Sequence, residues 1–241
     1  MNSIFSLFDR ITPIYDQMNK IMSFGKDKYW RKKLLSYVPW KKHKTLCVLD
    51  VACGTGAISE ILLKEAENYN QACCCWMLDP SSEMLAYART RCYTLMPFFE
   101  MHFLKGYAEA IPLPSRCAHV YICGFGLRNV QNRSFALQEA FRILVPNGVL
   151  LILEFSFEVL PSLAWAYRCY LMHGIPLIGK WIGKDQQAYQ YLSDSILKFP
   201  SPHVILKECF QTGFEKIFYT TLQAGLVQLY YAQKPYDSLH I

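Results

Sequence analysis

Apolar runs of strand length alternate with segments of helical period through the middle of the chain. Strands are predicted at about 46–51, 73–79, 99–105, 118–123 and 148–155, and helices near 57–68, 82–93 and 132–144. This alternation is typical of a parallel sheet covered by helices, so the pattern predicts an α/β fold. The stretch "VPNGVLLILEF" marks the last junction, because Pro146 and Gly148 end a helix directly before a fully apolar strand.

The pattern changes beyond the fifth strand. Residues 158–198 are predicted to form consecutive helices, broken at Pro161, at "HGIP" and at "GKWIGKD", and we interpret them as a lid over the carboxyl edge of the sheet. A helix in "SPHVILKECFQTGF" ends at Gly213, and strands at about 214–219 and 225–233 follow with no helix between them. This predicts an antiparallel terminal pair. We expect a single domain made of an N-terminal helical cap (1–44), a cofactor-binding core (45–157), the lid (158–198) and a terminal helix with its strand pair (199–241).

The composition agrees with one sizeable domain and excludes a largely disordered chain, since 52% of the 241 residues are apolar and 18% are charged. The N-terminus "MNSIFSLFDR" has Asp9 and Arg10 where a signal peptide needs an apolar core, so we expect a cytoplasmic protein with reduced thiols. Cys73, Cys74 and Cys75 fall inside the apolar run "ACCCWML" and no paired CxxC motif occurs. We therefore interpret these cysteines as buried apolar residues and predict no metal site.

The formal charge of +6 is concentrated near the N-terminus. Only Asp27 opposes eight basic residues within 19 positions, namely Lys26, Lys28, Arg31, Lys32, Lys33, Lys41, Lys42 and Lys44. Two interpretations stay open, a solvated helix face or attraction to anionic lipid headgroups. We expect no nucleic-acid partner, because no nucleic-acid-binding module accompanies the charge. The most membrane-like segment, 160–183, is interrupted by charged residues and proline before about 18 apolar residues accumulate, so it can lie on a bilayer but not span it.

The stretch "VLDVACGTGAIS" (48–59) has the order strand, glycine turn, helix. Because Gly54 and Gly56 have no Cβ, the backbone there can approach a ligand closely, and the following helix offers free N–H groups. Ser59 replaces the third glycine of the dinucleotide-binding fingerprint. Asp79 ends the second strand 25 residues after Gly54, where a carboxylate can accept hydrogen bonds from both ribose hydroxyls of an adenosyl group. These features alone leave NAD open as the ligand.

Three further features favour S-adenosylmethionine: the loop "DVACGTG", the sequence "GYAEAIPLP" after the third strand and the terminal strand pair. Asp50, beside the loop, has two interpretations. Its carboxylate either orients loop amides or faces the amino group of the cofactor, or it is a structural carboxylate at the end of a strand.

Several motifs together resemble the ubiquinone/menaquinone biosynthesis C-methyltransferase family. They are "LDVACGTG", "LDPSSEMLAYAR", "AEAIPLP", "FGLRNV", "ALQEAFRILVPNG", "LLILEFS", "PLIGK", "YQYLSDSI" and "AGLVQLYYAQKP". The resemblance is collinear from "FDRITPIYDQMNKIMSFGKDKYWRKK" to the C-terminus. It implies a class I S-adenosylmethionine-dependent methyltransferase fold, a Rossmann-like seven-stranded sheet with an antiparallel terminal strand and a helical insertion.

The resemblance also implies which residues bind S-adenosylmethionine. They are Thr55, Asp79, Tyr107, Ala108 and Gly124. With Asp50, Gly54 and Gly56, which the strand and glycine turn themselves indicate, they make up the eight predicted cofactor residues. Three positions depart from the family pattern. Tyr107 stands where Asp or Asn is usual, so a stacked ring would have to replace a hydrogen bond to adenine. Gly124 replaces a usual serine, and His119 replaces an Asp of the fourth strand.

The stretch "CGFGLRNV" leaves the fourth strand at the carboxyl edge, where parallel α/β sheets bind ligands. Arg128 and Asn129 are therefore expected where methyl donor and acceptor meet. In one interpretation Arg128 stabilises a phenolate, and the pair holds a water that takes the proton of a ring hydroxyl. In the other, Arg128 pairs with a carboxylate such as Glu154 to fix the loop. His173 in the lid is the second candidate for the base.

The N-terminal region is implied by the resemblance to fold over the pocket, with Tyr15 and Met18 as substrate contacts; ordinary capping of the domain is the alternative. The predicted reaction is C-methylation of a polyprenylated quinol at the inner face of the membrane, with demethylmenaquinol as the first-ranked acceptor. The ubiquinone-pathway benzoquinol is the alternative acceptor. Methylation of another small molecule and a non-catalytic adenosyl-binding subunit are the rival hypotheses, and a homodimer is among the expected assemblies.

Overall fold

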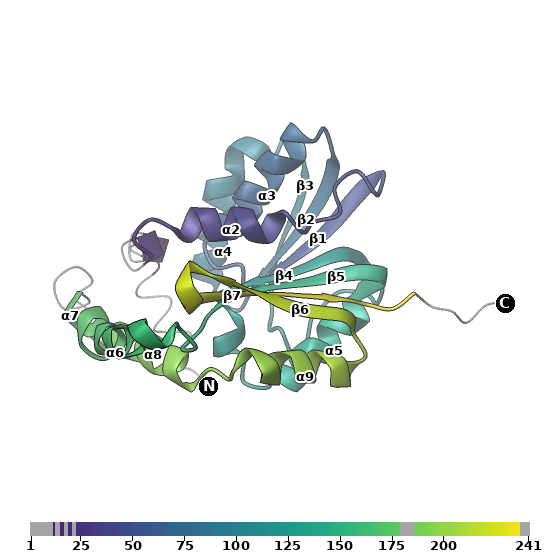
Figure 1. The fold of residues 1–241 in the computed structure, drawn as a ribbon. Coiled ribbons are helices and arrows are strands. Elements are labelled where there is room, and N and C mark those ends of the chain that lie inside the picture. The colour runs from purple at the N-terminus through teal and green to yellow at the C-terminus, as the bar shows by residue number, and fades with distance from the viewer. Residues whose placement is uncertain (1–11, 13–14, 17–18, 21–22, 179–185, 237–241) are drawn as a thin grey trace.

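The computed structural model describes residues 12, 15–16, 19–20, 23–178 and 186–236. One seven-stranded sheet runs through the molecule in the order β3-β2-β1-β4-β5-β7-β6 (Figure 1). Strands β1 to β5 are mutually parallel, whereas β7 is antiparallel to both β5 and β6. The predicted parallel sheet with an antiparallel terminal pair is confirmed.

The elements follow the apolar pattern of the sequence closely. The strands are β1 (Thr45–Val51), β2 (Ala72–Asp79), β3 (Glu100–Lys105), β4 (Ala118–Gly124), β5 (Leu144–Phe155), β6 (Glu215–Leu222) and β7 (Val227–Gln233). The helices are α2 (Asp27–Leu35), α3 (Ala57–Asn68), α4 (Ser82–Cys92), α5 (Arg133–Ile143), α6 (Pro161–Cys169), α7 (Ile175–Ile178), α8 (Gln186–Lys198) and α9 (Pro202–Thr212). The start of β5 is the largest deviation, because the chain becomes extended as soon as α5 ends and Leu144 already pairs with Ala118.

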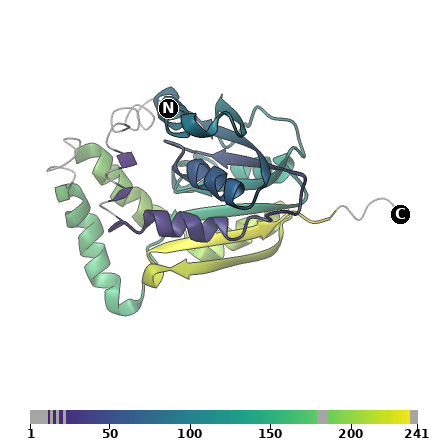
Figure 2. The ribbon, with the colours of Figure 1, turned by 90° about the horizontal axis from the view of Figure 1, so that it is seen from above.

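Helices cover both faces of the sheet (Figures 1 and 2). Helices α2, α3 and α4 bury apolar side chains against one face, for example Leu34, Leu62 and Ala88. Helices α5 and α9 bury Leu137 and Ile205 against the other face. The two buried clusters fix the sheet, and with it the positions of the loops at its carboxyl edge.

The lid helices α6, α7 and α8 form a separate group beside the sheet (Figure 2). Pro161 marks a helix boundary, as the sequence indicates, but it is the first residue of α6, and residues 158–160 are not helical. The predicted break at "HGIP" is wrong. A π-helical turn, Tyr170–Gly174, joins α6 directly to α7. A wider turn accommodates the missing N–H of Pro176 without ending the helix. The third predicted break, at 179–185, lies outside the described residues.

Within the described ranges, no helix combines the length and the apolar character needed to cross a bilayer.

Candidate active site

Three cavities follow one another along the carboxyl edge of the sheet. The first, about 410 Å³, is lined by residues that include Leu78, Tyr107, Ala108, Asn129 and Phe135. The second, about 60 Å³, is lined by residues that include Tyr15, Gly54, Asp79, Phe125 and Asn129. The third, about 30 Å³, is lined by residues that include Tyr15, Asp50, Gly54, Thr55 and Gly124. Because neighbouring cavities share lining residues, they form one elongated site.

The glycine turn between β1 and α3 depends on two glycines with positive φ, Gly54 (+55°) and Gly56 (+74°). A Cβ on Gly56 would lie 3.0 Å from the Cβ of Ala88, so only glycine lets α4 pack this closely. The Thr55 hydroxyl donates to Asp16 Oδ1 (2.8 Å) and accepts from Arg91 Nη1 (3.2 Å). Thr55 thereby ties the N-terminal segment to the turn.

Asp79 is buried at the end of β2, on the wall of the second cavity. Its Oδ2 accepts the N–H of Gly54 (2.9 Å) and its Oδ1 accepts the N–H of Ser81 (2.9 Å). The two bonds hold the carboxylate in a fixed orientation beside the glycine turn. This is the place where the sequence predicts a carboxylate for the two hydroxyls of a ribose.

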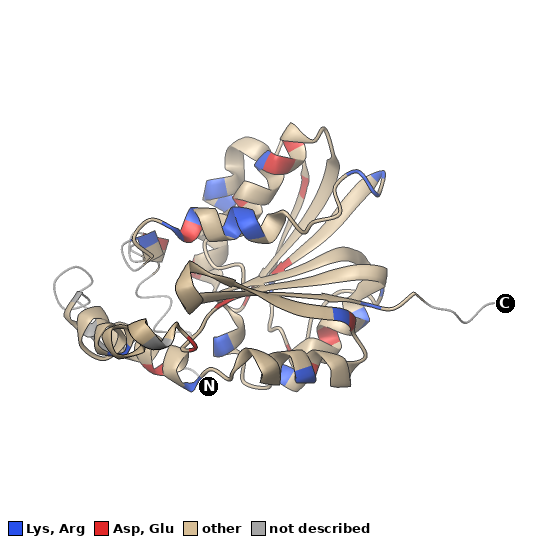
Figure 3. Cartoon of the chain, in the orientation of Figure 1, with Lys and Arg blue, Asp and Glu red and all other residues tan. Residues whose placement is uncertain are grey.

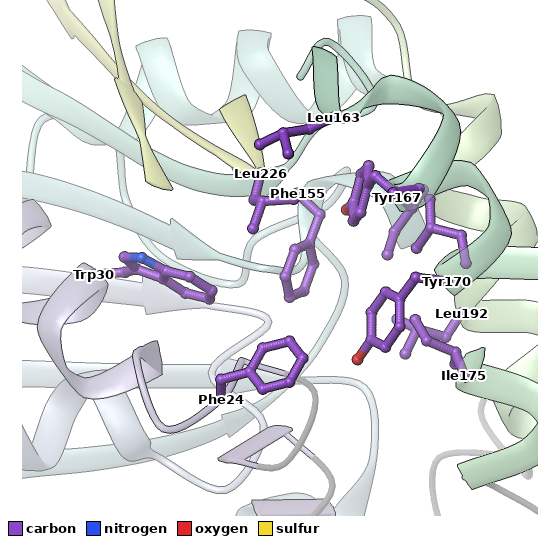
Figure 4. Close-up of a pocket in the computed structure, with 12 residues that line it drawn as sticks. Phe24, Trp30, Phe155, Leu163, Tyr167, Tyr170, Ile175, Leu192 and Leu226 are labelled. Carbon is purple, nitrogen blue, oxygen red and sulfur yellow. The ribbon is translucent and has the colours of Figure 1, made fainter. Parts of the chain in front are cut away.

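A fourth cavity, about 300 Å³ and almost wholly apolar, lies between the lid and the core (Figure 4). Its lining includes Phe24, Trp30, Phe155, Tyr167, Tyr170 and Leu192. The ring of Phe155 lies 4.6 Å from that of Phe125, which lines the second and third cavities. A contact between two aromatic rings therefore links the lining of the apolar cavity to that of the elongated site.

Comparison with known proteins agrees with this architecture. A model of the ubiE/COQ5 methyltransferase family matches residues 2–234. The chain belongs to the ubiE/COQ5 methyltransferase family. A protein of Rickettsia bellii named ubiquinone/menaquinone biosynthesis C-methyltransferase UbiE is 35% identical over 232 residues, which are 95% of this chain and 91% of the relative. A protein of the same name from Cereibacter sphaeroides is 34% identical over 227 residues, 94% of this chain and 88% of the relative.

Solved structures support the same fold. An S-adenosylmethionine-dependent methyltransferase of Thermotoga maritima superposes with a TM-score of 0.69 at 16% identity, covering 95% of this chain and 99% of that one. One from Aquifex aeolicus gives a TM-score of 0.61 at 17% identity, covering 90% and 97%. The chain has the class I methyltransferase fold and, as a member of the ubiE/COQ5 family, is an S-adenosylmethionine-dependent C-methyltransferase.

The elongated site fits this cofactor. The apolar first cavity suits an adenine, the fixed carboxylate of Asp79 suits a ribose, and the narrow third cavity suits the amino-acid end. Of the eight predicted cofactor residues, seven line these cavities, and Gly56 instead allows the turn to pack against α4. The structure thus brings the predicted cofactor residues of this ubiE/COQ5 family member together at one edge.

Asp50 lies fully buried beneath the third cavity, and its Oδ2 accepts the Ser59 hydroxyl at 2.6 Å. Burial raises the pKa of its carboxyl to about 7, against the hydrogen bond from Ser59, which lowers it. The raised pKa means that the folded protein binds this proton more tightly than the unfolded chain does. The favourable contribution of the neutral carboxyl to stability is therefore present at acid pH and is lost as the pH rises towards 7.

Binding of S-adenosylmethionine is expected to tighten as the pH rises from about 6 to 8, by up to roughly tenfold. The sulfonium and ammonium charges of the ligand favour the ionised form of Asp50. Below pH 7 the ligand therefore binds more weakly, because binding also has to remove the proton of the Asp50 carboxyl. Dissociation constants measured calorimetrically across this range should show the trend in the wild type and a flat profile in Asp50→Asn. Parallel profiles for the two proteins would contradict it.

The three departures from the family pattern have different structural consequences. Tyr107 is 45% exposed and lines the first cavity. A Cβ on Gly124 would lie 2.0 Å from Cδ1 of Ile58, so Ile58 occupies the space of the usual serine side chain. His119 lies at the other end of β4, where its Nδ1 accepts the N–H of Cys47 (2.9 Å). The lining of the three cofactor cavities does not include His119.

Arg128 is fully enclosed. Its Nη1 donates to Glu154 Oε1 (2.6 Å) and to the carbonyl oxygen of Phe125 (2.5 Å), and its own N–H donates to Glu154 Oε2 (3.1 Å). The side chains of Arg128 and Glu154 are 4% and 0% exposed. The lining residues of the four cavities described above do not include Arg128. This geometry agrees with the second interpretation of the sequence, in which Arg128 pairs with Glu154 and fixes the loop.

The other predicted substrate-side residues are dispersed. Asn129 lines the first and second cavities, and its Oδ1 accepts the hydroxyl of Tyr191 in α8 (3.0 Å). Tyr15 lines the second and third cavities. The side chain of His173 is exposed on the π-helical turn, outside the lining of the four cavities, and Met18 lies outside the described residues.

Sequence reasoning did not identify Tyr191 or Phe125 as site residues. Tyr191 falls within the motif "YQYLSDSI", which carried the family resemblance, but nothing in its spacing indicates a bond to a loop 62 residues away. Phe125 lies between the two glycines of "GFG" and has a positive φ of 58°, which is uncommon for a bulky residue. Both side chains connect the cofactor cavities to the lid side of the molecule.

Proposed function

We propose that this enzyme transfers a methyl group to a ring carbon of a polyprenylated quinol, and that demethylmenaquinol is its acceptor. The observation that carries the proposal is the apolar cavity between lid and core, whose lining residue Phe155 contacts Phe125 of the second and third cavities. Its aromatic and aliphatic lining suits a fused quinol ring or an isoprenoid tail. The names of the curated relatives support a quinone acceptor.

The donor would be held by Asp79 at the ribose, by the glycine turn with Thr55, and by Tyr107 and Ala108 beside the adenine. Bound S-adenosylmethionine supplies an activated methyl group. The residues of the chain then have to orient the acceptor, exclude water and stabilise the ring hydroxyl as it loses its proton.

Asn129 is the residue best placed for the acceptor side, because it lines the donor cavities and is bonded to the lid through Tyr191. Arg128 contributes indirectly. It fixes the loop that carries Asn129, and its guanidinium lies 5.5 Å from the centre of the Phe155 ring. We propose Asn129 and Arg128 as the residues that organise the acceptor site, and we do not assign the base to the exposed His173.

The basic residues of α2 support action at an anionic membrane surface. Figure 3 shows the Lys and Arg positions of this helix in blue, and Lys28, Lys32 and Lys33 are exposed. Trp30 of the same helix lines the apolar cavity. A tailed substrate could thus pass from the lipid surface towards the cavity without crossing a wide aqueous layer.

Filling the apolar cavity is expected to weaken binding of the acceptor and to leave binding of the donor unchanged. In Ala166→Phe, the added ring should raise KM for demethylmenaquinol and lower kcat/KM about tenfold or more, with S-adenosylhomocysteine affinity unchanged within about twofold. Transfer of label from methyl-labelled S-adenosylmethionine to each reduced quinol measures this. Ser162→Phe, an exposed position of the same helix outside the cavity lining, is the matched control.

Two outcomes would contradict the proposal. If purified enzyme leaves all label in the donor with either quinol, the acceptor class is wrong. If the benzoquinol is methylated and demethylmenaquinol is not, the ubiquinone-pathway acceptor takes its place.

A further inference from the structure

We propose that Arg31 binds the α-carboxylate of the methyl donor, and that it forms a specificity subsite for the amino-acid end of the ligand. The inference rests on the cofactor of the enzyme and is independent of the quinol acceptor proposed above.

The location of Arg31 in α2 is the first observation. Its side chain lines the third cavity together with Asn19, Asp50, Gly54 and Thr55. Among the described residues that line the three cofactor cavities, Arg31 is the only lysine or arginine. A ligand whose amino-acid end enters the third cavity therefore meets a single cationic side chain there.

The hydrogen bonding of Arg31 is the second observation. Its Nη1 donates to Asp27 Oδ2 at 2.5 Å, one helical turn earlier, and the Arg31 side chain is only 10% exposed. Within the described part of the chain, its Nε and Nη2 have no hydrogen-bond partner. Asp27 therefore holds the guanidinium while two donors of its planar fork stay available. Two such donors match the two oxygens of a carboxylate.

The other arginines near the edge are already engaged. Arg91 forms ion pairs with Asp16 and Glu60, and Arg128 is enclosed with Glu154. Neither lines the third cavity. This leaves Arg31 as the cation available to a ligand carboxylate.

Arg31 and Asp50 also make the third cavity complementary to a zwitterion. Arg31 lies close enough to Asp50 to lower the pKa of its carboxyl, although burial causes a larger rise. The guanidinium of Arg31 matches the α-carboxylate of an amino acid, and the carboxyl of Asp50 accepts from the α-ammonium group and ionises beside it. Ligands that lack the carboxylate should lose the contribution of Arg31 and retain that of Asp50.

The test compares two ligands that differ only in this group, S-adenosylhomocysteine and its decarboxylated analogue. Dissociation constants are measured by calorimetry for the wild type, Arg31→Gln, Arg31→Lys and the control Lys33→Gln, which changes an exposed lysine of the same helix. In Arg31→Gln, the dissociation constant for S-adenosylhomocysteine should rise about 30-fold or more, whereas that for the decarboxylated analogue should change by less than about twofold. The affinity of Arg31→Lys for S-adenosylhomocysteine should lie between those of the wild type and Arg31→Gln, because an ammonium group cannot form the two parallel hydrogen bonds of a guanidinium. Lys33→Gln should bind both ligands like the wild type.

Three outcomes would overturn the proposal. Equal losses for both ligands in Arg31→Gln would mean that Arg31 only supports α2. No loss for either would mean that the carboxylate binds elsewhere. If the wild type itself binds the two ligands equally, no carboxylate subsite exists, and this comparison holds even where a variant does not fold. None of these measurements involves an acceptor, so they are independent of the quinol proposal.

Discussion

Replacing Asp79 with alanine is expected to weaken S-adenosylhomocysteine binding by at least about 100-fold, since each tenfold corresponds to about 1.4 kcal/mol and two charge-assisted hydrogen bonds are lost. The carboxylate also accepts the N–H groups of Gly54 and Ser81, so its removal leaves the glycine turn without its anchor on β2. Both effects act on the part of the site where we expect the ribose to bind. Titration calorimetry with S-adenosylhomocysteine measures the loss directly, without an acceptor.

Two further variants separate the contributions at this position. Asp79→Asn keeps the size of the side chain but has one acceptor oxygen, so it can accept only one of the two backbone N–H groups. Its affinity for S-adenosylhomocysteine should therefore lie between those of Asp79→Ala and the wild type. Glu83→Gln, an exposed acidic residue in the first turn of α4, controls for the loss of one negative charge and should bind like the wild type. Wild-type affinity in Asp79→Ala would remove the ribose from this part of the site.

The carboxyl edge of the sheet was predictable because its residues are close in sequence to strand ends. Alternating apolar runs located β1 and β2, and Asp79 lies at the end of β2 on the wall of a cavity, as the pattern predicted. The glycine turn was equally predictable, since the positive φ values at Gly54 and Gly56 favour residues without a Cβ. Local signals of this kind determine both where a side chain is and what it can do.

Residues supplied by distant elements were not predictable in the same way. Arg31 belongs to a basic run whose periodicity only indicates a helix, and its position on the third cavity depends on how α2 packs on the sheet. Arg128 had two interpretations because sequence distance does not reveal that Glu154, at the end of the neighbouring strand β5, lies beside it. The π-helical turn of the lid was missed for a related reason. Gly174 and Pro176 permit a break but do not require one when the surrounding helix is packed.

The departure at Gly124 illustrates how a residue in a packed edge depends on its neighbour, here Ile58. The serine usual at Gly124 would need space that Cδ1 of Ile58 occupies, and Ile58 itself lines the third cavity. The edge therefore keeps its packing while exchanging a hydroxyl for an apolar surface. The first cavity shows a similar exchange, with the ring of Tyr107 in place of a shorter polar side chain.

The pair Arg128–Glu154 gives the second large expected effect, on stability. Arg128→Met should lower the free energy of unfolding by about 3–5 kcal/mol, because it leaves the carboxylate of the fully buried Glu154 without a counter-ion. Glu154→Leu should cost a similar amount, since the guanidinium is then the unpaired buried charge. The double variant Arg128→Met/Glu154→Leu should recover most of the loss, because a buried ion pair can be replaced by apolar residues of similar size at little cost. Urea unfolding of the four proteins measures these differences.

The same four proteins separate loop fixing from contact with the donor. Arg128 does not line the cofactor cavities, so the double variant should bind S-adenosylhomocysteine within about threefold of the wild type once its stability is restored. Lys105→Met, at an exposed position at the end of β3, is the control for a surface charge and should change stability by less than about 0.5 kcal/mol. A change below about 1 kcal/mol in Arg128→Met would show that the loop is held without the ion pair. A double variant as unstable as either single variant would mean that the pair contributes specific hydrogen bonds, among them the one to the Phe125 carbonyl, that apolar packing does not replace.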